Sequence, residues 1–446
     1  FGIKPLYYYF KNNGDLYFAS EIKQFTKLNN WESVLNNDRA YDYLCFAQTD
    51  HTNETMFEGV YQVPPGHYCE FKINNFSKKI EFKKWYFLKK KRFRGTLKEA
   101  AEKLRVLFKN AVEIRMKADV PIGTCLSGGI DSSSIACVVN NLISKKEFQK
   151  TFSSCSEHDL YDETYFIKEV LKNLKNAQPI LFNLDHAQFK KKIQSLVYTH
   201  DEPFLSPSVF AQSCVYEKVI KSNVKVNLDG HGSDEQLCGY HDFFGPMLFY
   251  YFKKLRWIKL FKEIFYLKKL YNYNFLYSFN KILAGFLPKF LYNFLYRVMK
   301  AQTLNENLIN LRLINKKTLK PKITNEKERS LEQIFRTKIP KQLKWCDRNS
   351  MSNSVESRIP FLDYRLVEFL FSIPVEFKIC NGITKKVFRE SMKTYLPKKI
   401  YNRVDKMGFV TPAELWVRND PIFYKNLILS LQENSKNIFN KKAIVK

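Results

Sequence analysis

The segment from Val120 to Ser134 constrains the fold of this chain more than any other. It joins an apolar strand pattern to a helix pattern through S-G-G-I-D-S at residues 127–132. A strand, a tight glycine turn and a helix start leave several backbone N–H groups directed at one point, where the helix dipole favours negative charge. The glycines let the backbone approach a phosphate closely. No lysine follows them, so this is not the G-K-[ST] loop. The segment predicts a different phosphate-binding turn at a strand end.

Two carboxylates come shortly after apolar strand patterns. Asp131 lies inside this turn, where a carboxylate beside a phosphate is repulsive unless a cation lies between them. Asp234 lies in D-G-H-G-S-D-E at residues 229–235, directly after the apolar run 224–228. Mg²⁺ commonly uses one or two carboxylates together with phosphate oxygens. We therefore predict that Asp131 and Asp234 hold Mg²⁺. The alternative for Asp234 is an ordinary acidic residue in the first turn of a helix.

Strand and helix patterns alternate after residue 95, which predicts an α/β fold. Such alternation implies a parallel sheet with right-handed crossovers, in which ligands bind at the carboxyl ends of the strands. Residues 1–90 show a different pattern. Two aromatic strand patterns flank N-N-G-D at 12–15 and predict a β-hairpin. The expected elements after residue 95 are a helix at 97–117, the strand before the glycine turn, strands at 151–155, 179–184 and 224–228, and a helix at 162–174.

The amino-acid composition limits which partners and which cellular compartment we expect. The net charge of +29 invites a nucleic-acid hypothesis, but the charge is spread along the chain and no RNA-binding motif is visible, so we expect no specific nucleic-acid partner. Nine cysteines without C-x-x-C pairs favour reduced thiols in the cytoplasm and argue against a zinc site. The 446 residues suggest two domains or more. Because the chain begins at Phe1 without Met, we expect it to be processed or incomplete.

Residues 245–300 combine phenylalanine, tyrosine, leucine and basic residues, with Glu263 as the only acid. An amphipathic surface that contacts an anionic membrane is one interpretation. The other is a helical insertion whose aromatic side chains pack on the main domain while lysines face water. We expect the second, and we place a helical insertion at about 245–340.

Two further motifs follow, S-R-I-P-F-L-D at 357–363 and K-M-G-F at 406–409. In this order the four motifs resemble the glutamine-hydrolysing asparagine synthetase family, a class II glutamine amidotransferase joined to a synthetase domain with a pyrophosphate loop. The resemblance covers nearly the whole chain. It implies a parallel-sheet α/β synthetase domain of the adenine-nucleotide α-hydrolase type at 95–446. Residues 1–90 would be the remnant of an α+β glutaminase sandwich and a linker.

The resemblance implies an ATP-dependent amide-forming ligase. ATP adenylates a carboxylate, which is the β-carboxylate of aspartate in the type member, and pyrophosphate leaves. Ammonia, normally made from glutamine, then displaces AMP to give asparagine. We consider a homodimer as the assembly of this chain. Matching positions imply Ser127, Gly128, Gly129 and Ser132 for pyrophosphate, Asp131 and Asp234 for Mg²⁺, Leu126 and Ser154 beside adenosine, Asp229 and Gly230 at the nucleotide border, and Lys406 against the leaving pyrophosphate.

Two departures from the family bear on function. The glutaminase nucleophile of the family is an N-terminal cysteine, and the internal Cys45 and Cys69 cannot take that part, so we expect this chain to use ammonia rather than hydrolyse glutamine. His231, a candidate catalytic base, occupies a position that is Glu or Asp in typical members. Histidine supplies no fixed negative charge, so the acceptor stays open between aspartate and another carboxylate such as a sugar acid or peptide.

Two rival functions are weighed against the ligase. A basic RNA-binding protein with the same loop is disfavoured by S-R-I-P-F-L-D and K-M-G-F. A catalytically inactive scaffold is disfavoured by the intact Ser127, Asp131, Asp234 and Lys406. The ligase hypothesis requires that the carboxylates of Asp131 and Asp234 lie close enough to share one ion.

Overall fold

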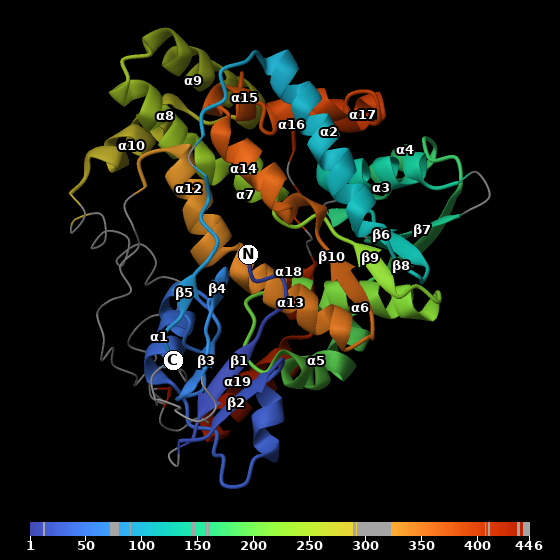
Figure 1. Ribbon diagram of the computed structural model, residues 1–446, viewed down its shortest axis with the longest axis vertical. Coiled ribbons are helices and arrows are strands. Elements are labelled where there is room, and N and C mark those ends of the chain that lie inside the picture. The colour runs from blue at the N-terminus through green and yellow to red at the C-terminus, as the bar shows by residue number, and fades with distance from the viewer. Residues whose placement is uncertain are drawn as a thin grey trace.

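The structure is a computed structural model. Its description covers the chain apart from residues 12–13, 72–79, 90, 145–147, 157, 159–160, 289–290, 292–322, 406, 409–410, 435–437 and 440–446. A five-stranded parallel sheet with the order β10-β9-β6-β7-β8 forms the centre (Figure 1). Its strands are β6 (Ile122–Cys125), β7 (Gln149–Cys155), β8 (Ala177–Asn183), β9 (Val226–Leu228) and β10 (Glu356–Arg358). The predicted α/β class and the four predicted strands are confirmed, with slightly shifted ends. The three-residue β10 was not predicted, because it is too short to show an alternating pattern.

Helices cover both faces of this sheet (Figure 1). On one face, β6, α2 and α3 share an apolar cluster with later helices, and the rings of Phe108, Phe361 and Phe388 pack within it at centroid distances of 4.9 to 5.3 Å. On the other face, α6 and α13 pack around Phe152 and Val215. The helices before β9 are α2 (Leu97–Arg115), α3 (Ile130–Leu142), α4 (Thr164–Leu171), α5 (His186–His200) and α6 (Ser208–Lys221).

Helix α2 illustrates how local sequence sets an element. The Thr96 hydroxyl accepts a hydrogen bond from the backbone N–H of Glu99, while the Glu99 carboxylate accepts one from the N–H of Thr96 at 2.7 Å. This capping box satisfies two otherwise unpaired donors and starts the helix at Leu97. The buried residues of α2 are Ala100, Ala101, Leu104, Phe108, Ala111 and Val112.

The N-terminal residues form a small antiparallel sheet with the order β2-β1-β3, and the predicted hairpin is present. Charged groups join it to the parallel sheet domain. The buried Lys344 ammonium lies 2.6 Å from the Asp50 carboxylate and 2.9 Å from that of Glu202. The elements are β1 (Tyr7–Phe10), β2 (Leu16–Ala19), a 3₁₀ turn (Ile22–Lys27), α1 (Asn37–Phe46), β3 (Val60–Gln62), β4 (His67–Tyr68) and β5 (Lys83–Lys84).

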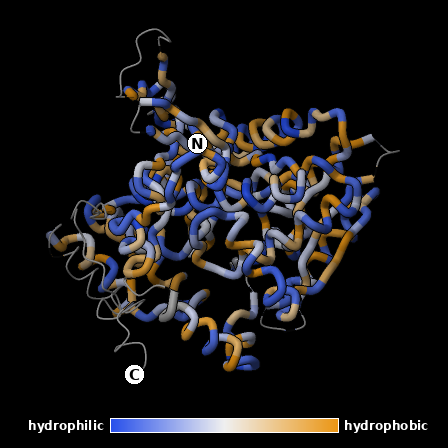
Figure 2. The backbone as a smooth tube through the Cα atoms, turned by 90° about the horizontal axis from the view of Figure 1, so that it is seen from below, coloured by the Kyte–Doolittle hydropathy of each residue, from blue (hydrophilic) through white to orange (hydrophobic). Residues whose placement is uncertain are grey.

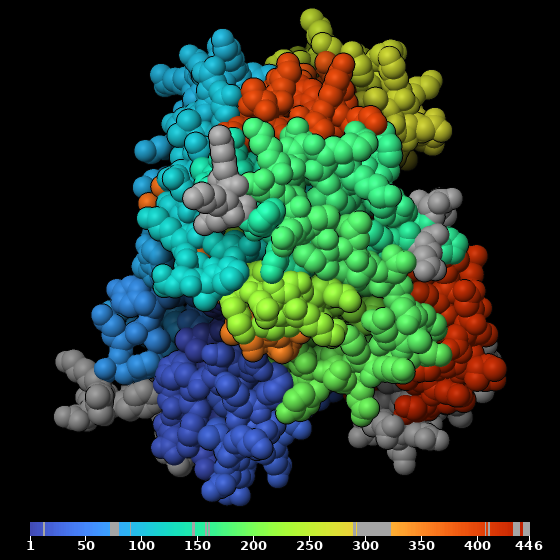
Figure 3. Space-filling view, turned by 90° about the vertical axis from the view of Figure 1, so that its right-hand side faces the viewer, coloured from blue at the N-terminus to red at the C-terminus, as the bar shows by residue number. Residues whose placement is uncertain are grey.

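A group of helices follows β9, of which α8, α9 and α10 lie at the opposite end of the molecule from β1, β2 and β3, while α7 and α12 lie between (Figure 1). Figure 3 shows the same separation, with α9 in olive at the top and the N-terminal residues in dark blue at the bottom. After α7 (Ser233–Leu237) come α8 (Phe244–Lys253), α9 (Trp257–Tyr271), α10 (Phe275–Phe286) and α12 (Glu326–Glu332). The aromatic side chains of α8 are largely buried, as expected. The expectation is wrong for Phe261 and Phe265 of α9 and Phe275 of α10, which stay exposed.

The C-terminal part returns to the sheet. Its elements are a π-helical turn (Gln333–Thr337), α13 (Ile339–Met351), β10, a 3₁₀ turn (Pro360–Leu362), α14 (Tyr364–Ser372), α15 (Val375–Lys378), α16 (Lys386–Met392), α17 (Lys398–Asn402), α18 (Ala413–Asn419) and α19 (Pro421–Asn434). Hydrophilic and hydrophobic stretches follow one another throughout the tube in Figure 2. Among the described residues, no helix is long and apolar enough to cross a membrane.

All nine cysteines are described and free of disulfides.

Candidate functional site

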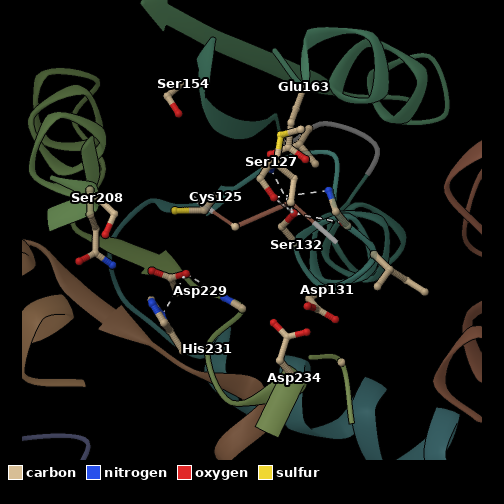
Figure 4. A pocket seen from close by; sticks show the side chains of 18 of the residues that line it. Cys125, Ser127, Asp131, Ser132, Ser154, Glu163, Ser208, Asp229, His231 and Asp234 are labelled. Carbon is tan, nitrogen blue, oxygen red and sulfur yellow. Dashed lines mark hydrogen bonds and ion pairs between the residues drawn. The ribbon is translucent and has the colours of Figure 1, made fainter. Parts of the chain in front are cut away.

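A cavity of about 350 Å³ lies where β6, β7 and β9 end (Figure 4). It collects side chains from both glycine-rich turns and from residues much later in the chain. Of the residues predicted from the sequence, the cavity wall contains Leu126, Ser127, Gly129, Asp131, Ser132, Ser154, Asp229, Gly230, His231 and Asp234. Gly128 lies in the same turn but not in the wall, and Lys406 falls outside the described residues.

The predicted phosphate turn has the geometry of an anion site. Gly128 adopts φ +74°, and a Cβ there would lie 2.7 Å from the Cβ of Phe166, so only glycine fits. The Ser132 hydroxyl accepts a hydrogen bond from the Ser127 backbone N–H at 3.1 Å, which closes the turn. Helix α3 starts beyond Gly129 without a side-chain cap. The start of this 13-residue helix at the cavity therefore suits a phosphate group.

Asp131 and Asp234 converge on one cation. The Lys385 ammonium donates to Asp131 Oδ2 at 2.6 Å and lies 2.6 Å from Asp234 Oδ1. These two oxygens are therefore separated by no more than twice 2.6 Å, which is close enough to share an ion. The Ser233 hydroxyl also donates to Asp131 Oδ1, at 2.6 Å. The requirement placed on the two carboxylates is met, and the donor set of carboxylate oxygens suits Mg²⁺.

Lys385 was not predicted as a site residue. Its side chain is 3% exposed, and its backbone adopts φ +56°, which is costly for a residue with a Cβ. It precedes α16 at the place where Arg389 donates to the Thr384 carbonyl oxygen at 3.0 Å. In the sequence Lys385 is one lysine among many, beside Lys386. The sequence signal that was available is a lysine directly before a helix, followed four residues later by an arginine.

Arg403 was also missed. Its guanidinium donates to the Gly128 carbonyl oxygen at 3.2 Å, pairs with Glu163 at 2.8 Å and lies 3.9 Å from the ring centre of Phe166. It thereby connects the phosphate turn to the segment that leads into K-M-G-F. On that segment, Asp405 and Met407 line the cavity.

His231 belongs to a compact polar cluster. Its Nδ1 lies 3.3 Å from Asp229 Oδ1, and the Tyr216 hydroxyl donates to Asp229 Oδ2 at 3.1 Å. The ligand-capable atoms of Asp229, His231 and Cys346 all lie within 4.8 Å of one another. Burial lowers the pKa of His231, but the neighbouring Asp229, Cys346 and Glu235 outweigh it and raise the pKa to about 10. The ring is therefore an imidazolium at neutral pH and a proton donor. A protonated ring has no free lone pair, and the role of His231 as a catalytic base stays a prediction.

The cavity has two unlike ends. In Figure 4 the hydroxyl of Ser154 lies across the cavity from Asp131 and Asp234. Leu126 is 1% exposed and is held by its backbone N–H, which donates to the Phe152 carbonyl oxygen at 2.9 Å. The charged end thus suits phosphates, and the end near Ser154 carries fewer charges and suits a nucleoside. The predicted roles of Leu126 and Ser154 remain predictions.

Comparison with known proteins gives two family matches. The model of the asparagine synthase family matches residues 103–446, and the model of the glutamine amidotransferase domain matches residues 1–86. Asparagine synthetase [glutamine-hydrolyzing] 1 of Bacillus subtilis is 27% identical over 94% of this chain and 66% of its own length. Amidase chyE of Penicillium rubens is 25% identical over 98% of this chain and 70% of its own length. Putative asparagine synthetase [glutamine-hydrolyzing] 2 of Methanocaldococcus jannaschii is 31% identical over 54% of this chain and 45% of its own length.

Proposed function

Because the chain belongs to the asparagine synthase family, we propose that it is an ATP-dependent ligase that forms an amide from a carboxylate and ammonia. A carboxylate oxygen of the acceptor attacks the α-phosphate of ATP, pyrophosphate leaves, and ammonia then displaces AMP from the acyl adenylate. The observation that carries the proposal is the convergence of Asp131 and Asp234 on one cation beside the phosphate turn.

In this proposal the charged end of the cavity binds the phosphates. Asp131 and Asp234 would hold Mg²⁺, which offsets phosphate charge when it is bound. Lys385 supplies a positive charge at the same place and neutralises the two acids in the free protein. The backbone N–H groups at the start of α3 bind and orient the anion. Lys406 would add a further cation against the leaving pyrophosphate.

The acceptor is proposed to be the β-carboxylate of aspartate, as in the type member of the family. His231 supports a second candidate, a different carboxylate such as a sugar acid or peptide. A cationic ring beside Asp229 replaces the acid of typical members and would attract an anionic acceptor rather than an ammonium group. Two relatives are themselves named amidases, in Penicillium rubens and Gibberella zeae.

The source of ammonia is the remaining part of the proposal. The match of residues 1–86 to the glutamine amidotransferase domain supports glutamine as the donor in a protein that contains that whole domain. For the 446-residue chain itself we propose that free ammonia suffices, since the cavity for adenylation lies among residues 125–412. An ammonium salt should then replace glutamine in the assay.

An exchange assay tests the proposal. The purified chain is incubated with Mg·ATP, labelled pyrophosphate and single carboxylates, with aspartate, sugar acids and acidic peptides in separate reactions. Label should enter ATP only when the true acceptor is present, because exchange requires a reversible acyl-adenylate step. A protein that shows no exchange with any carboxylate, or the same exchange without one, would not be such a ligase. If a sugar acid or peptide drives exchange and aspartate does not, the second candidate replaces the first.

A further inference from the structure

Helix α9 presents an apolar stripe to solvent. Ile258, Phe261 and Phe265 lie at positions i, i+3 and i+7, so their side chains share one face. Their exposed fractions are 86%, 59% and 62%. A single exposed apolar side chain is ordinary, whereas several on one face mark a surface that contacts another body.

Helix α10 repeats the pattern. Its exposed apolar residues recur at helical spacing, and Phe275 and Leu276 are each more than 60% exposed. The outer faces of α9 and α10 are from here called the insertion surface. Its α10 members are Phe275, Leu276, Phe279 and Leu283.

Core packing does not account for the insertion surface. The inward side chains of the same helices, Leu260, Leu267 and Ile282, lie in an apolar cluster with the residues of α8. Each helix therefore already buries one face against the protein. An amphipathic helix needs only that face, so the solvent-exposed apolar side chains are not required for this packing.

Lysines flank the apolar stripe, and the only acid among residues 243–288 is turned away from it. Glu263 is 5% exposed, and its carboxylate accepts hydrogen bonds from the backbone N–H groups of Asn381 at 2.9 Å and Gly382 at 2.8 Å. The exposed lysines are Lys253, Lys254, Lys262, Lys268, Lys269 and Lys281, together with Lys259, whose ammonium lies 3.0 Å from the Glu376 carboxylate. The combination is an apolar stripe with a cationic border and no exposed carboxylate within these residues.

From this surface we propose that α9 and α10 dock the protein on an anionic lipid bilayer. Aromatic and aliphatic side chains enter the boundary between headgroups and acyl chains, to a depth of about 5–10 Å, while the lysines contact the lipid phosphates. Charge complementarity selects a lipid surface over a neutral apolar partner. The described helices cannot span the bilayer, so the contact lies in the plane of one leaflet.

The docking helix is tied to the candidate site. The Tyr271 hydroxyl donates to the Gly382 carbonyl oxygen at 3.0 Å, and Glu263 holds the same turn. That turn leads directly to Lys385 in the cavity. A bilayer bound to α9 would therefore hold the cavity at a defined orientation. The inference does not depend on the proposed ligase reaction.

Vesicle binding tests the inference with the full chain. Sucrose-loaded vesicles of phosphatidylcholine alone are compared with vesicles that contain phosphatidylglycerol, by co-sedimentation at low and at physiological salt. We expect binding to the anionic vesicles only, and weaker binding as salt rises, because counter-ions screen the lysine–phosphate attraction. Equal binding to both vesicle types would overturn the proposal.

A matched pair of triple variants locates the surface. Ile258→Asp/Phe261→Asp/Phe265→Asp should lower the partition coefficient on anionic vesicles by at least about tenfold, since it removes the apolar contacts and adds three negative charges. The control makes the same charge change at exposed apolar positions elsewhere, Val106→Asp/Phe148→Asp/Val197→Asp. An insertion variant that binds like the wild type, or a control that loses as much, contradicts the assignment.

Trp257 provides a readout that needs no folded triple variant. It stands at the start of α9 and is 42% exposed. Its fluorescence should shift to shorter wavelength when the wild type meets anionic vesicles, and the shift should vanish in Trp257→Phe. Absence of the shift in the wild type contradicts the proposal. A wild-type dimer that the triple variant converts to monomer, without vesicle binding, would identify a second copy of the chain as the occupant and would also overturn it.

Discussion

Proteins usually bury apolar side chains and expose charged ones. The cavity departs from this pattern by enclosing charges, and the insertion surface departs from it by exposing apolar side chains. Around the cavity, the charges of Asp131, Asp234 and Lys385 are withdrawn from water and held at 2.6 Å. On the insertion surface, Ile258 and Phe265 remain in water. Buried charge and exposed apolar area both cost free energy in the isolated protein. The difference teaches that each region has a cost that a ligand would offset, which in our two proposals is a phosphate with its metal at the cavity and an anionic lipid surface at the helices.

The largest expected effect concerns the cavity. Asp131→Asn should lower pyrophosphate release by about a thousandfold, because the amide cannot hold a cation that offsets phosphate charge. Initial rates with Mg·ATP, ammonium and the acceptor measure this, and circular dichroism checks the fold. Asp119→Asn, at an exposed carboxylate outside the cavity, should leave the rate unchanged. Full activity of Asp131→Asn would remove the cation-site assignment.

The second prediction contrasts phenylalanines of the two regions. Phe108→Ala should lower the free energy of unfolding by about 4 kcal/mol, since the ring is fully buried between Phe361 and Phe388. Phe261→Ala on the insertion surface should change it by less than about 0.5 kcal/mol. Urea unfolding of both variants measures the difference. Similar losses would show that Phe261 is part of the core and that the insertion surface is covered.

The third prediction compares the loss of Lys385 with the loss of an ordinary surface lysine, by its effect on stability with and without Mg²⁺. Lys385→Met removes the ammonium that lies between the Asp131 and Asp234 carboxylates and should cost about 3 kcal/mol of stability in the absence of divalent ions. Added Mg²⁺ should restore thermal stability to this variant more than to the wild type. Lys386→Met serves as the control, since that lysine pairs with Glu390 outside the cavity. If Mg²⁺ stabilises all three proteins equally, the ion does not bind between Asp131 and Asp234.

The smallest effect concerns a buried polar group away from the cavity. His200 is 1% exposed, and burial, with nearby Lys344 and Arg348, lowers its pKa to about 4. The unfolded chain therefore binds one more proton than the folded protein between pH 6.5 and 4. The stability from the neutral ring is complete above pH 6.5 and is lost as the pH falls through about 4. In His200→Gln the free energy of unfolding should fall less over this range. Identical pH profiles by urea unfolding would contradict the assignment.

Local patterns made part of this molecule predictable. The hairpin, the strands before both glycine turns and the turn at 127–132 depend on neighbours in the chain, so their sequence carries the information. The positions of Asp131 and Asp234 at one sheet edge followed from the parallel sheet. By contrast, α9 is apolar on both faces, so periodicity could not tell its packed face from its exposed one.

Sequence by itself therefore determined the α/β class, the family and the two acids that meet at the cavity. Tertiary structure decided that Lys385 lies between these acids, that Cys346 lies beside His231 and that Phe261 points to solvent. The physical reason is separation along the chain. Contacts between residues more than a hundred positions apart depend on how whole helices pack on the sheet, and no local pattern records that packing.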